Sequence, residues 1–183
     1  LDAVEQAASG AKVIYLQRSR GYSLRPTLSV EAIGQAAQRA HRANPGCIVM
    51  VDNCYGEFVE RSEPTEQGAD LAVGSLIKNP GGGLAPTGGY IAGRKELVEQ
   101  AAYRLTSPGM GKEVGCTLGQ NKSLFMGLFF APSVVASAVR TAVFASRLFQ
   151  LLGFPVYPAY DEPRSDIIQA VELGDPQRLV AFC

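Results

Sequence analysis

Hydrophobic and polar residues follow one another along the first eighty residues in a pattern typical of strands joined by helices. Apolar runs of strand length occupy residues 12–17, 47–51 and 71–75. Between the first two runs, Ser29 precedes a predicted helix that ends before Pro45. The apolar positions of this helix keep the helical period: Val30, Ile33, Ala36, Ala37 and Ala40. A strand, a helix and a strand in this order form a right-handed crossover, so the pattern predicts a parallel sheet.

The next segments change the direction of the chain. Residues 88–93 form another predicted strand, separated from the third run by only about a dozen residues without helical pattern. Such a short link favours an antiparallel return over a crossover. Residues 94–105 form an amphipathic helix, and residues 106–119 form a long Gly-rich loop of the kind that lines a site or an interface.

Residues 124–152 are strongly apolar, but Pro132, Arg140 and Arg147 interrupt them, so no uncharged run of about 20 residues spans a membrane. We expect one or two buried helices there, at a domain or subunit contact. Beyond Gly153 we expect a strand at 166–172 and a helix that begins near Pro176.

Two charged residues stand where predicted strands end. Asp52 follows the apolar run 47–51, and a buried acid is costly unless it has a partner. Lys78 follows the run 71–75 and precedes Pro80 and three glycines, so no helix continues through it. Ligands of α/β sheets bind at the carboxyl ends of strands, so we expect Asp52 and Lys78 to reach one crevice.

The sequence around these residues resembles that of a known family. Asp52-x-x-Tyr55 and Ser75-x-x-Lys78 look like the core of fold-type I enzymes that depend on pyridoxal phosphate. The stretches VDNCYGEF, GSLIKNPGGGLAPTGGYIAG and SPGMGKEVG closely resemble the methionine gamma-lyase-like family, also called aluminium-resistance proteins, and the match covers nearly the whole chain.

The resemblance implies an α/β fold whose sheet is mainly parallel, with one antiparallel strand and helices on both faces. Residues 1–153 would form part of the cofactor-binding large domain without its N-terminal part. Residues 154–183 would begin a small C-terminal domain, so we expect the sequence to be a fragment.

The resemblance also implies roles for four residues. Lys78 would be the Schiff-base lysine, and Asp52 would hold the protonated pyridine nitrogen, which makes the ring an electron sink. Tyr55 would donate to the ring's phenolate oxygen, and Ser75 would bind the phosphate. The better-known lyases of methionine and cystathionine carry threonine where this chain has Ile77, so one phosphate contact is missing.

A basic segment follows the first strand on the expected crevice side, with arginines at 18, 20 and 25. Arg20 is our candidate for binding the cofactor, and Tyr22 is a further candidate. Arg18 or Arg20 would face an anionic group. A solvated basic loop remains the alternative for this segment.

The amino-acid composition limits the classes of partner and site that we expect. The 183 residues carry 17 basic and 17 acidic side chains, which gives no electrostatic reason to expect nucleic acid or an anionic membrane. The four cysteines form no C-x-x-C pair and are expected to be reduced thiols of a cytoplasmic protein. The single histidine, His41, is expected at the surface, so neither a metal site nor a Ser-His site is expected.

The expected function is that of a pyridoxal-phosphate-dependent carbon–sulfur lyase acting on a small sulfur amino acid, in a homodimer or homotetramer. A β- or γ-elimination, or the chemistry of an aminotransferase, remains open, as does a fragment that keeps the fold without activity of its own. The motif Ser75-x-x-Lys78 also occurs in penicillin-binding proteins, but there a helix follows the serine, and Asn79-Pro80-Gly81 forbids one. A phosphate-binding P-loop is disfavoured because the lysine precedes the glycines and no G-x-x-x-x-G-K-[ST] motif occurs.

Overall fold

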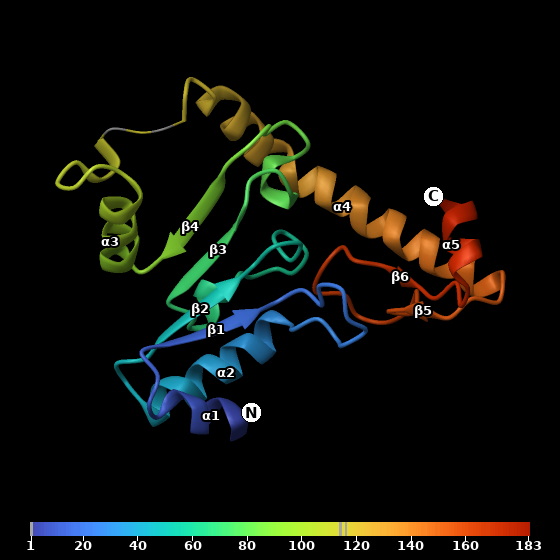
Figure 1. Ribbon diagram of the computed structural model, residues 1–183, viewed down its shortest axis with the longest axis horizontal. Coiled ribbons are helices and arrows are strands. Elements are labelled where there is room, and N and C mark those ends of the chain that lie inside the picture. The colour runs from blue at the N-terminus through green and yellow to red at the C-terminus, as the bar shows by residue number, and fades with distance from the viewer. Residues whose placement is uncertain (1, 114, 116) are drawn as a thin grey trace.

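A four-stranded sheet forms the centre of the computed structural model, which describes residues 2–113, 115 and 117–183 (Figure 1). Its strands follow chain order: β1 (Val13–Gln17), β2 (Ile48–Asp52), β3 (Leu71–Ser75) and β4 (Gly89–Gly93). The first three strands are parallel, and β4 returns antiparallel beside β3. The predicted mainly parallel sheet with one antiparallel strand is therefore confirmed.

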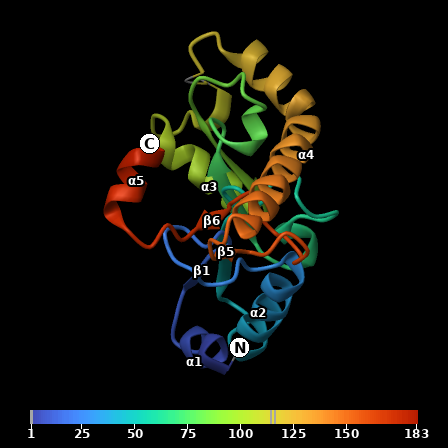
Figure 2. The same ribbon diagram turned by 90° about the vertical axis from the view of Figure 1, so that its right-hand side faces the viewer.

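Two helices form the core with the sheet. Helix α2 (Val30–Ala43) begins at Ser29, whose side-chain oxygen accepts a hydrogen bond from the Ala32 amide at 3.1 Å. Helix α1 (Asp2–Ala8) packs beside α2 (Figures 1 and 2). The buried cluster includes Ile33 and Ala37 of α2 and Val49 and Val51 of β2. The apolar run at 47–51 is thus a core strand, as the sequence predicts.

Helices α1 and α2 lie together on one face of the parallel strands, where they pack against β2. The connections β1 to β2 and β2 to β3 step in the same direction across the sheet. Because parallel crossovers are right-handed, both connections fall on the same face, where the 3-10 helix η1 (Pro64–Gln67) packs against α2. On the other face, Val13 and Tyr15 of β1 are exposed.

The apolar segment expected to be buried forms one helix, α4 (Asn121–Leu151), and most of its surface is exposed. Length and composition, taken by themselves, would allow this helix to cross a membrane. Only one stripe of the helix is buried, because only that stripe contacts neighbouring elements. Its buried residues are Gly127, Ala131, Val135, Ala142 and Ser146. The contact with η2 (Asn79–Gly81) is close, since a Cβ atom added to Gly127 would lie 2.2 Å from the Gly81 carbonyl oxygen.

Helix α3 (Lys95–Leu105) follows β4 as predicted, and η3 (Gly111–Glu113) lies in the Gly-rich loop. Our expectations for this loop and for the cysteines also involve Val114 and Cys116, which lie outside the described residues. Cys47, Cys54 and Cys183 are free thiols.

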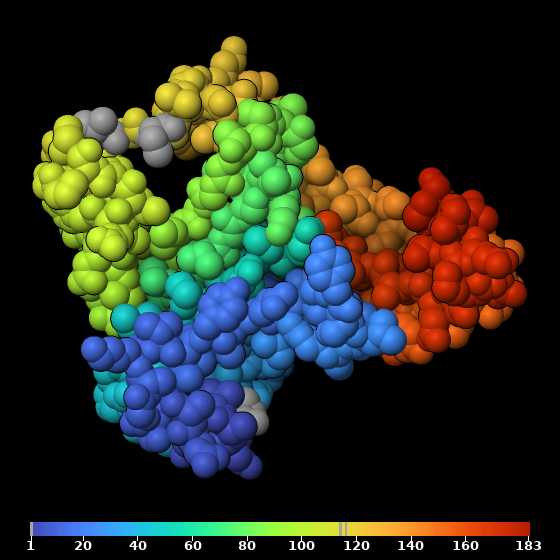
Figure 3. Space-filling model, in the orientation of Figure 1, coloured from blue at the N-terminus to red at the C-terminus, as the bar shows by residue number. Residues whose placement is uncertain are grey.

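The C-terminal segment and the end of α4 form a lobe beside the sheet (Figure 3). It contains the short antiparallel strands β5 (Val156–Tyr157) and β6 (Ala170–Val171), followed by α5 (Pro176–Phe182). The strand expected at 166–172 is therefore shorter. Its first residue, Asp166, bends away because its carboxylate accepts hydrogen bonds from Ser19, Thr27 and the Ile168 amide.

His41 is not the surface residue that we expected. It is half-buried, and its Nε2 atom lies 2.8 Å from Oδ2 of the buried Asp70. Asp70 precedes β3 and also accepts hydrogen bonds from the Val49 amide and Arg94. His41 therefore ties α2 to the start of β3.

Candidate functional site

The candidate residues lie at one edge of the sheet because the strands that carry them are parallel and in register. Gln17 pairs with Asp52 at the ends of β1 and β2, and Asp52 pairs with Val73 of β3. Ser75 ends β3, and Lys78 follows after a turn in which its amide donates to the Ser75 carbonyl. The carboxyl ends of all three strands therefore share this edge.

Asp52 is held by two hydrogen bonds. The Tyr15 hydroxyl donates to its Oδ2 atom at 3.0 Å, and the Cys54 amide donates to its Oδ1 atom at 3.1 Å. Partial burial, and after it the Asp52 carboxylate, raise the pKa of the Tyr15 hydroxyl, so Tyr15 remains a donor. Tyr15 escaped the sequence analysis because nothing in its run of apolar residues distinguishes it.

Lys78 stands over an aromatic ring. Its ammonium nitrogen lies 4.3 Å from the centre of the Tyr55 ring, within the range of a cation–π contact. Tyr55 has a left-handed backbone conformation, with φ of 71°, which is uncommon for a residue with a large side chain. Burial, the largest single influence, lowers the pKa of Lys78, but Cys54 and Tyr55 together outweigh it and raise that pKa.

Cys54 connects these residues and was not a sequence candidate. Burial raises the pKa of its thiol, and so does Asp52, whereas Lys78 and the Ser75 backbone act in the opposite direction. The Cys54 thiol therefore lies in the electrostatic field of both Asp52 and Lys78. Its position in the motif, two residues after the strand-ending acid, was the available signal.

A cavity of about 740 Å³ opens beside Lys78. Tyr55, Arg20 and Tyr22 line it together with Lys78, whereas Asp52 and Ser75 are not among its lining residues. The structure thus brings Lys78, Tyr55 and Arg20 to one cavity and keeps Asp52 and Ser75 at the neighbouring strand ends.

The arginines after β1 have different environments. Arg18 is fully buried, and its guanidinium donates to Asn53 at 2.7 Å, to Glu60 at 3.0 Å and to Glu63 at 3.4 Å. It anchors the loop that carries Tyr55. Arg20 is also buried, but its Nε and Nη1 atoms have no hydrogen-bond partner among the described residues. Of the two, only Arg20 lines the cavity beside Lys78.

A buried carboxyl group lies next to the site and was not predicted. Glu57 is only 3% exposed, and its Oε1 atom accepts a hydrogen bond from the Tyr90 hydroxyl at 2.9 Å. Burial raises the pKa of Glu57 to about 7. No group of three or more His, Cys, Asp or Glu residues that could hold a metal ion occurs in the described residues.

The sequence matches the methionine gamma-lyase family over residues 2–183. The chain belongs to this family. It is 48% identical over its whole length to the uncharacterized protein YnbB of Bacillus subtilis and spans 44% of that protein. It is also similar to the structure of a carbon–sulfur lyase involved in aluminium resistance from Clostridium novyi NT. That similarity has 44% identity and a TM-score of 0.93, and it covers all of this chain and 44% of that one.

A more distant relative has a named activity. The L-methionine gamma-lyase of Treponema denticola is 29% identical over 117 residues, which cover 63% of this chain and 27% of that protein. Membership of the methionine gamma-lyase family confirms the fold class, that of fold-type I pyridoxal-phosphate enzymes. The chain spans less than half the length of these family members.

Proposed function

We propose that the full-length protein is a pyridoxal-phosphate-dependent carbon–sulfur lyase that acts on a small sulfur amino acid. The observation that carries the proposal is the position of Lys78. Its ammonium nitrogen lies 4.3 Å from the centre of the Tyr55 ring, and the lysine lines a large cavity at the sheet edge where β2 ends in Asp52. An amine and an aromatic ring at one cavity, with a carboxylate at the neighbouring strand end, are groups that this cofactor uses.

The residues present fit the cofactor in size and charge. A cavity of about 740 Å³ lies within the usual range of small-molecule sites. Arg20 lines this cavity, and its positive charge suits a ligand with negative charge. Ser75 stands at the strand end, from which we propose that it contacts the phosphate, while Ile77 offers no hydroxyl there.

Each residue then has a proposed task. Lys78 Nζ would hold the cofactor and would serve as the base that moves the α-proton of the substrate. Tyr55 holds the lysine through its ring and offers its hydroxyl to the cofactor ring. Asp52 keeps its carboxylate in place through Tyr15 and the Cys54 amide. The bound cofactor supplies an electron sink that stabilises negative charge on the α-carbon of the substrate.

We also propose a homodimer or homotetramer in the cytoplasm. The exposed apolar side chains of α4, which include Phe125, Phe129 and Phe144, suit a subunit contact. The free thiols of Cys47, Cys54 and Cys183 suit a reducing compartment.

The test uses the full-length protein. It should bind pyridoxal phosphate with visible absorbance, and borohydride should fix the cofactor to the peptide that contains Lys78. Lys78→Ala should lose this attachment and all release of thiol or keto acid from methionine, cysteine and cystathionine. The control Lys95→Ala, at an exposed position, should retain both.

Asp52→Asn should keep the cofactor but lower turnover at least about 100-fold, since each 1.4 kcal/mol of lost transition-state stabilisation costs about tenfold. Cofactor fixed to another lysine would contradict the site. A bound cofactor without release of any thiol or keto acid would contradict the lyase activity and leave the cofactor proposal intact.

A further inference from the structure

A short segment of the C-terminal lobe, residues 166–168, reaches the candidate site. Ile168 lines the cavity beside Lys78, as Tyr55 does. The amide of Ile167 donates a hydrogen bond to the Tyr55 carbonyl oxygen at 3.2 Å. The segment therefore contacts the loop that carries Tyr55 and forms part of the cavity wall.

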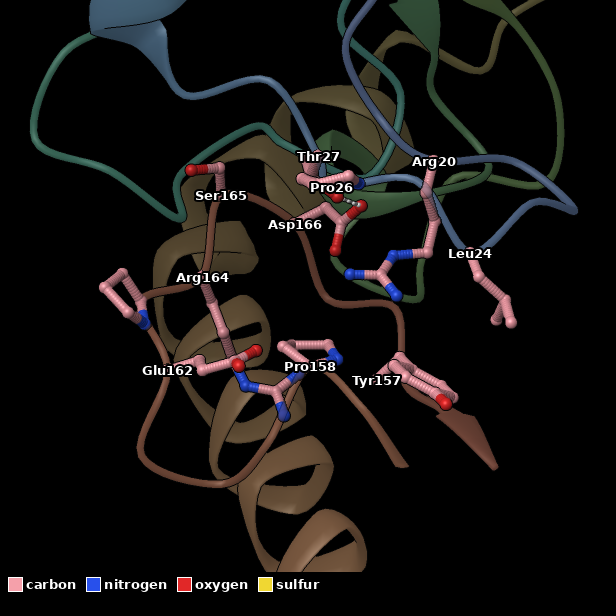
Figure 4. A pocket seen from close by; sticks show the side chains of 11 residues that line it. Arg20, Leu24, Pro26, Thr27, Tyr157, Pro158, Glu162, Arg164, Ser165 and Asp166 are labelled. Carbon is pink, nitrogen blue, oxygen red and sulfur yellow. Dashed lines mark hydrogen bonds between the residues drawn. The ribbon is translucent and has the colours of Figure 1, made fainter. Parts of the chain in front are cut away.

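The buried carboxylate of Asp166 holds this segment in place. Asp166 is only 2% exposed. Its Oδ2 atom accepts hydrogen bonds from Ser19 at 2.8 Å and from Thr27 at 2.5 Å, both in the loop after β1, and its Oδ1 atom accepts from the Ile168 amide at 3.0 Å. Figure 4 shows the Asp166 and Thr27 side chains pointing toward one another from the two segments. One carboxylate thus ties residues 166–168 to the loop after β1.

The charge of Asp166 has a different effect from its hydrogen bonds. Arg20 and Arg164 line the same pocket of about 290 Å³ as Asp166 (Figure 4), but Asp166 forms no ion pair with either of them in the described residues. Burial lowers the pKa of Arg164, and the charge of Asp166 opposes this effect. The charge therefore stabilises a neighbouring arginine, whereas the hydrogen bonds determine where the segment lies.

We infer that Asp166 is a positioning residue, which fixes the Tyr55 ring beside Lys78 through the segment 166–168. Tyr55 has a left-handed backbone with φ of 71°, a conformation that persists only when surrounding contacts hold it. The Ile167 amide holds the carbonyl of the residue whose ring centre lies 4.3 Å from the lysine nitrogen. The inference rests on Lys78 as the reactive amine of the proposed function, but not on the lyase reaction.

Competitive labelling of lysines measures the contact between Tyr55 and Lys78 without any turnover. The full-length protein would react with acetic anhydride at pH 8 in the absence of pyridoxal phosphate. Only the neutral amine reacts, and an aromatic ring stabilises the ammonium form. Asp166→Ala should therefore speed the labelling of Lys78 about threefold, which corresponds to a cation–π contact of about 0.7 kcal/mol. The labelling of Lys95, which is exposed, should not change in the same sample.

The variant Asp166→Asn separates the hydrogen bonds from the charge. Asparagine can accept from the Ile168 amide and donate to the hydroxyl oxygens of Ser19 and Thr27, so it can keep the segment in place. We expect this variant to label Lys78 at a rate within about 1.5-fold of the parent protein. Labelling as fast as in Asp166→Ala would show that charge and not position matters, and would overturn the inference.

A second control tests for general loss of stability. Ser146→Ala removes a buried hydrogen bond, 2.9 Å long, to the Pro158 carbonyl at the base of the same lobe. This variant should melt at a lower temperature and still label Lys78 at the parent rate. If it labels Lys78 as fast as Asp166→Ala does, the lysine responds to any weakening of the lobe, and the positioning role is wrong.

A double-mutant cycle tests whether Asp166 acts through Tyr55. Tyr55→Leu removes the ring and should speed the labelling of Lys78 at least as much as Asp166→Ala does. When the ring is already absent, Asp166→Ala should add less than about 1.5-fold. A full threefold increase in both backgrounds would mean that Asp166 does not act through Tyr55, and would overturn the inference.

Turnover assays on the same variants separate this inference from the proposed function. The expected labelling pattern in a protein that releases no thiol or keto acid from any sulfur amino acid would overturn the lyase proposal and leave the role of Asp166 standing. Unchanged labelling of Lys78 in Asp166→Ala, in a protein that does release thiol, would overturn the role of Asp166 and leave the lyase activity standing.

Discussion

Replacement of Glu57 by glutamine should stabilise the protein at alkaline pH and have little effect at acidic pH. The carboxyl group is 3% exposed, and its Oε2 atom has no hydrogen-bond partner in the described residues. Burial is the main reason that its pKa rises to about 7, and the charge of Glu63 acts in the same direction. Hydrogen bonds from the backbone and Tyr90, and the charge of Arg18, oppose the rise.

The magnitude follows from the pKa difference. A rise from the ordinary value of 4.5 to about 7 corresponds to about 3 kcal/mol, at about 1.4 kcal/mol per unit. Between these two values the folded protein binds more protons than the unfolded chain, so the free energy of unfolding falls as the pH rises. Below the lower value Glu57 is neutral in both states and carries no penalty. Above about pH 7 the full cost of the buried charge applies.

Urea denaturation at pH 4.5 and pH 8 measures the effect. Glu57→Gln should raise the free energy of unfolding by up to about 3 kcal/mol at pH 8 and by much less at pH 4.5. Glutamine keeps the shape and can still accept the Tyr90 hydrogen bond. Glu172→Gln, at an exposed position, is the control and should change stability equally at both pH values. An equal effect of Glu57→Gln at both pH values would refute the buried, protonated carboxyl group.

Two further substitutions test how the site and helix α4 are held. Tyr15→Phe removes the donor to Asp52 and should lower the free energy of unfolding by about 1 kcal/mol in urea denaturation, while Tyr22→Phe, with a fully exposed side chain, should change nothing. An unchanged stability would show that water replaces the hydroxyl at no cost. Gly127→Val should cost about 3 kcal/mol in thermal denaturation because its Cβ atom would meet the Gly81 carbonyl oxygen at 2.2 Å, and the exposed Ser133→Ala in the same helix should cost nothing. A stable valine variant would mean that α4 does not lie against η2.

The elements that the sequence predicted correctly are those with a strong hydrophobic pattern. The run at 47–51 forms β2 because alternate residues such as Val49 and Val51 are fully buried against α2. The return strand β4 followed from chain length alone, since a dozen residues cannot cross the sheet. Placement of Asp52 and Lys78 at one edge followed from the same parallel pairing.

The features that the sequence did not predict depend on contacts between distant residues. Arg18 and Arg20 occur in the same loop and look alike, but Arg18 meets Glu60 and Glu63 more than 40 positions away. Helix α4 looks like a buried helix by composition, yet only a narrow stripe of it has anything to pack against in the described chain. The composition of a segment shows whether its burial is favourable, but not whether the protein has a surface that covers it.

The loop after β2 shows how buried polar residues hold the candidate site. The Tyr55 ring lies 4.3 Å from the Lys78 ammonium nitrogen, while the Glu57 side chain is buried. Asn79, the residue after Lys78, is buried and donates a hydrogen bond from its side chain to the Glu57 carbonyl at 3.0 Å. This bond joins the lysine segment to the loop that carries Tyr55.

The same loop is fixed from its other side by Arg18. Asn53 accepts a hydrogen bond from Arg18 at 2.7 Å, and a Cβ atom at Gly56 would lie 2.4 Å from the Arg18 Nε atom, so the loop passes directly over the guanidinium. Buried hydrogen bonds are directional, whereas apolar packing tolerates shifts. The buried hydrogen bonds of Arg18 and Asn79 offset the strain of the left-handed Tyr55 backbone and keep the Tyr55 ring under the lysine. Arg18 and Asn79 therefore help to set the position of Tyr55 beside Lys78.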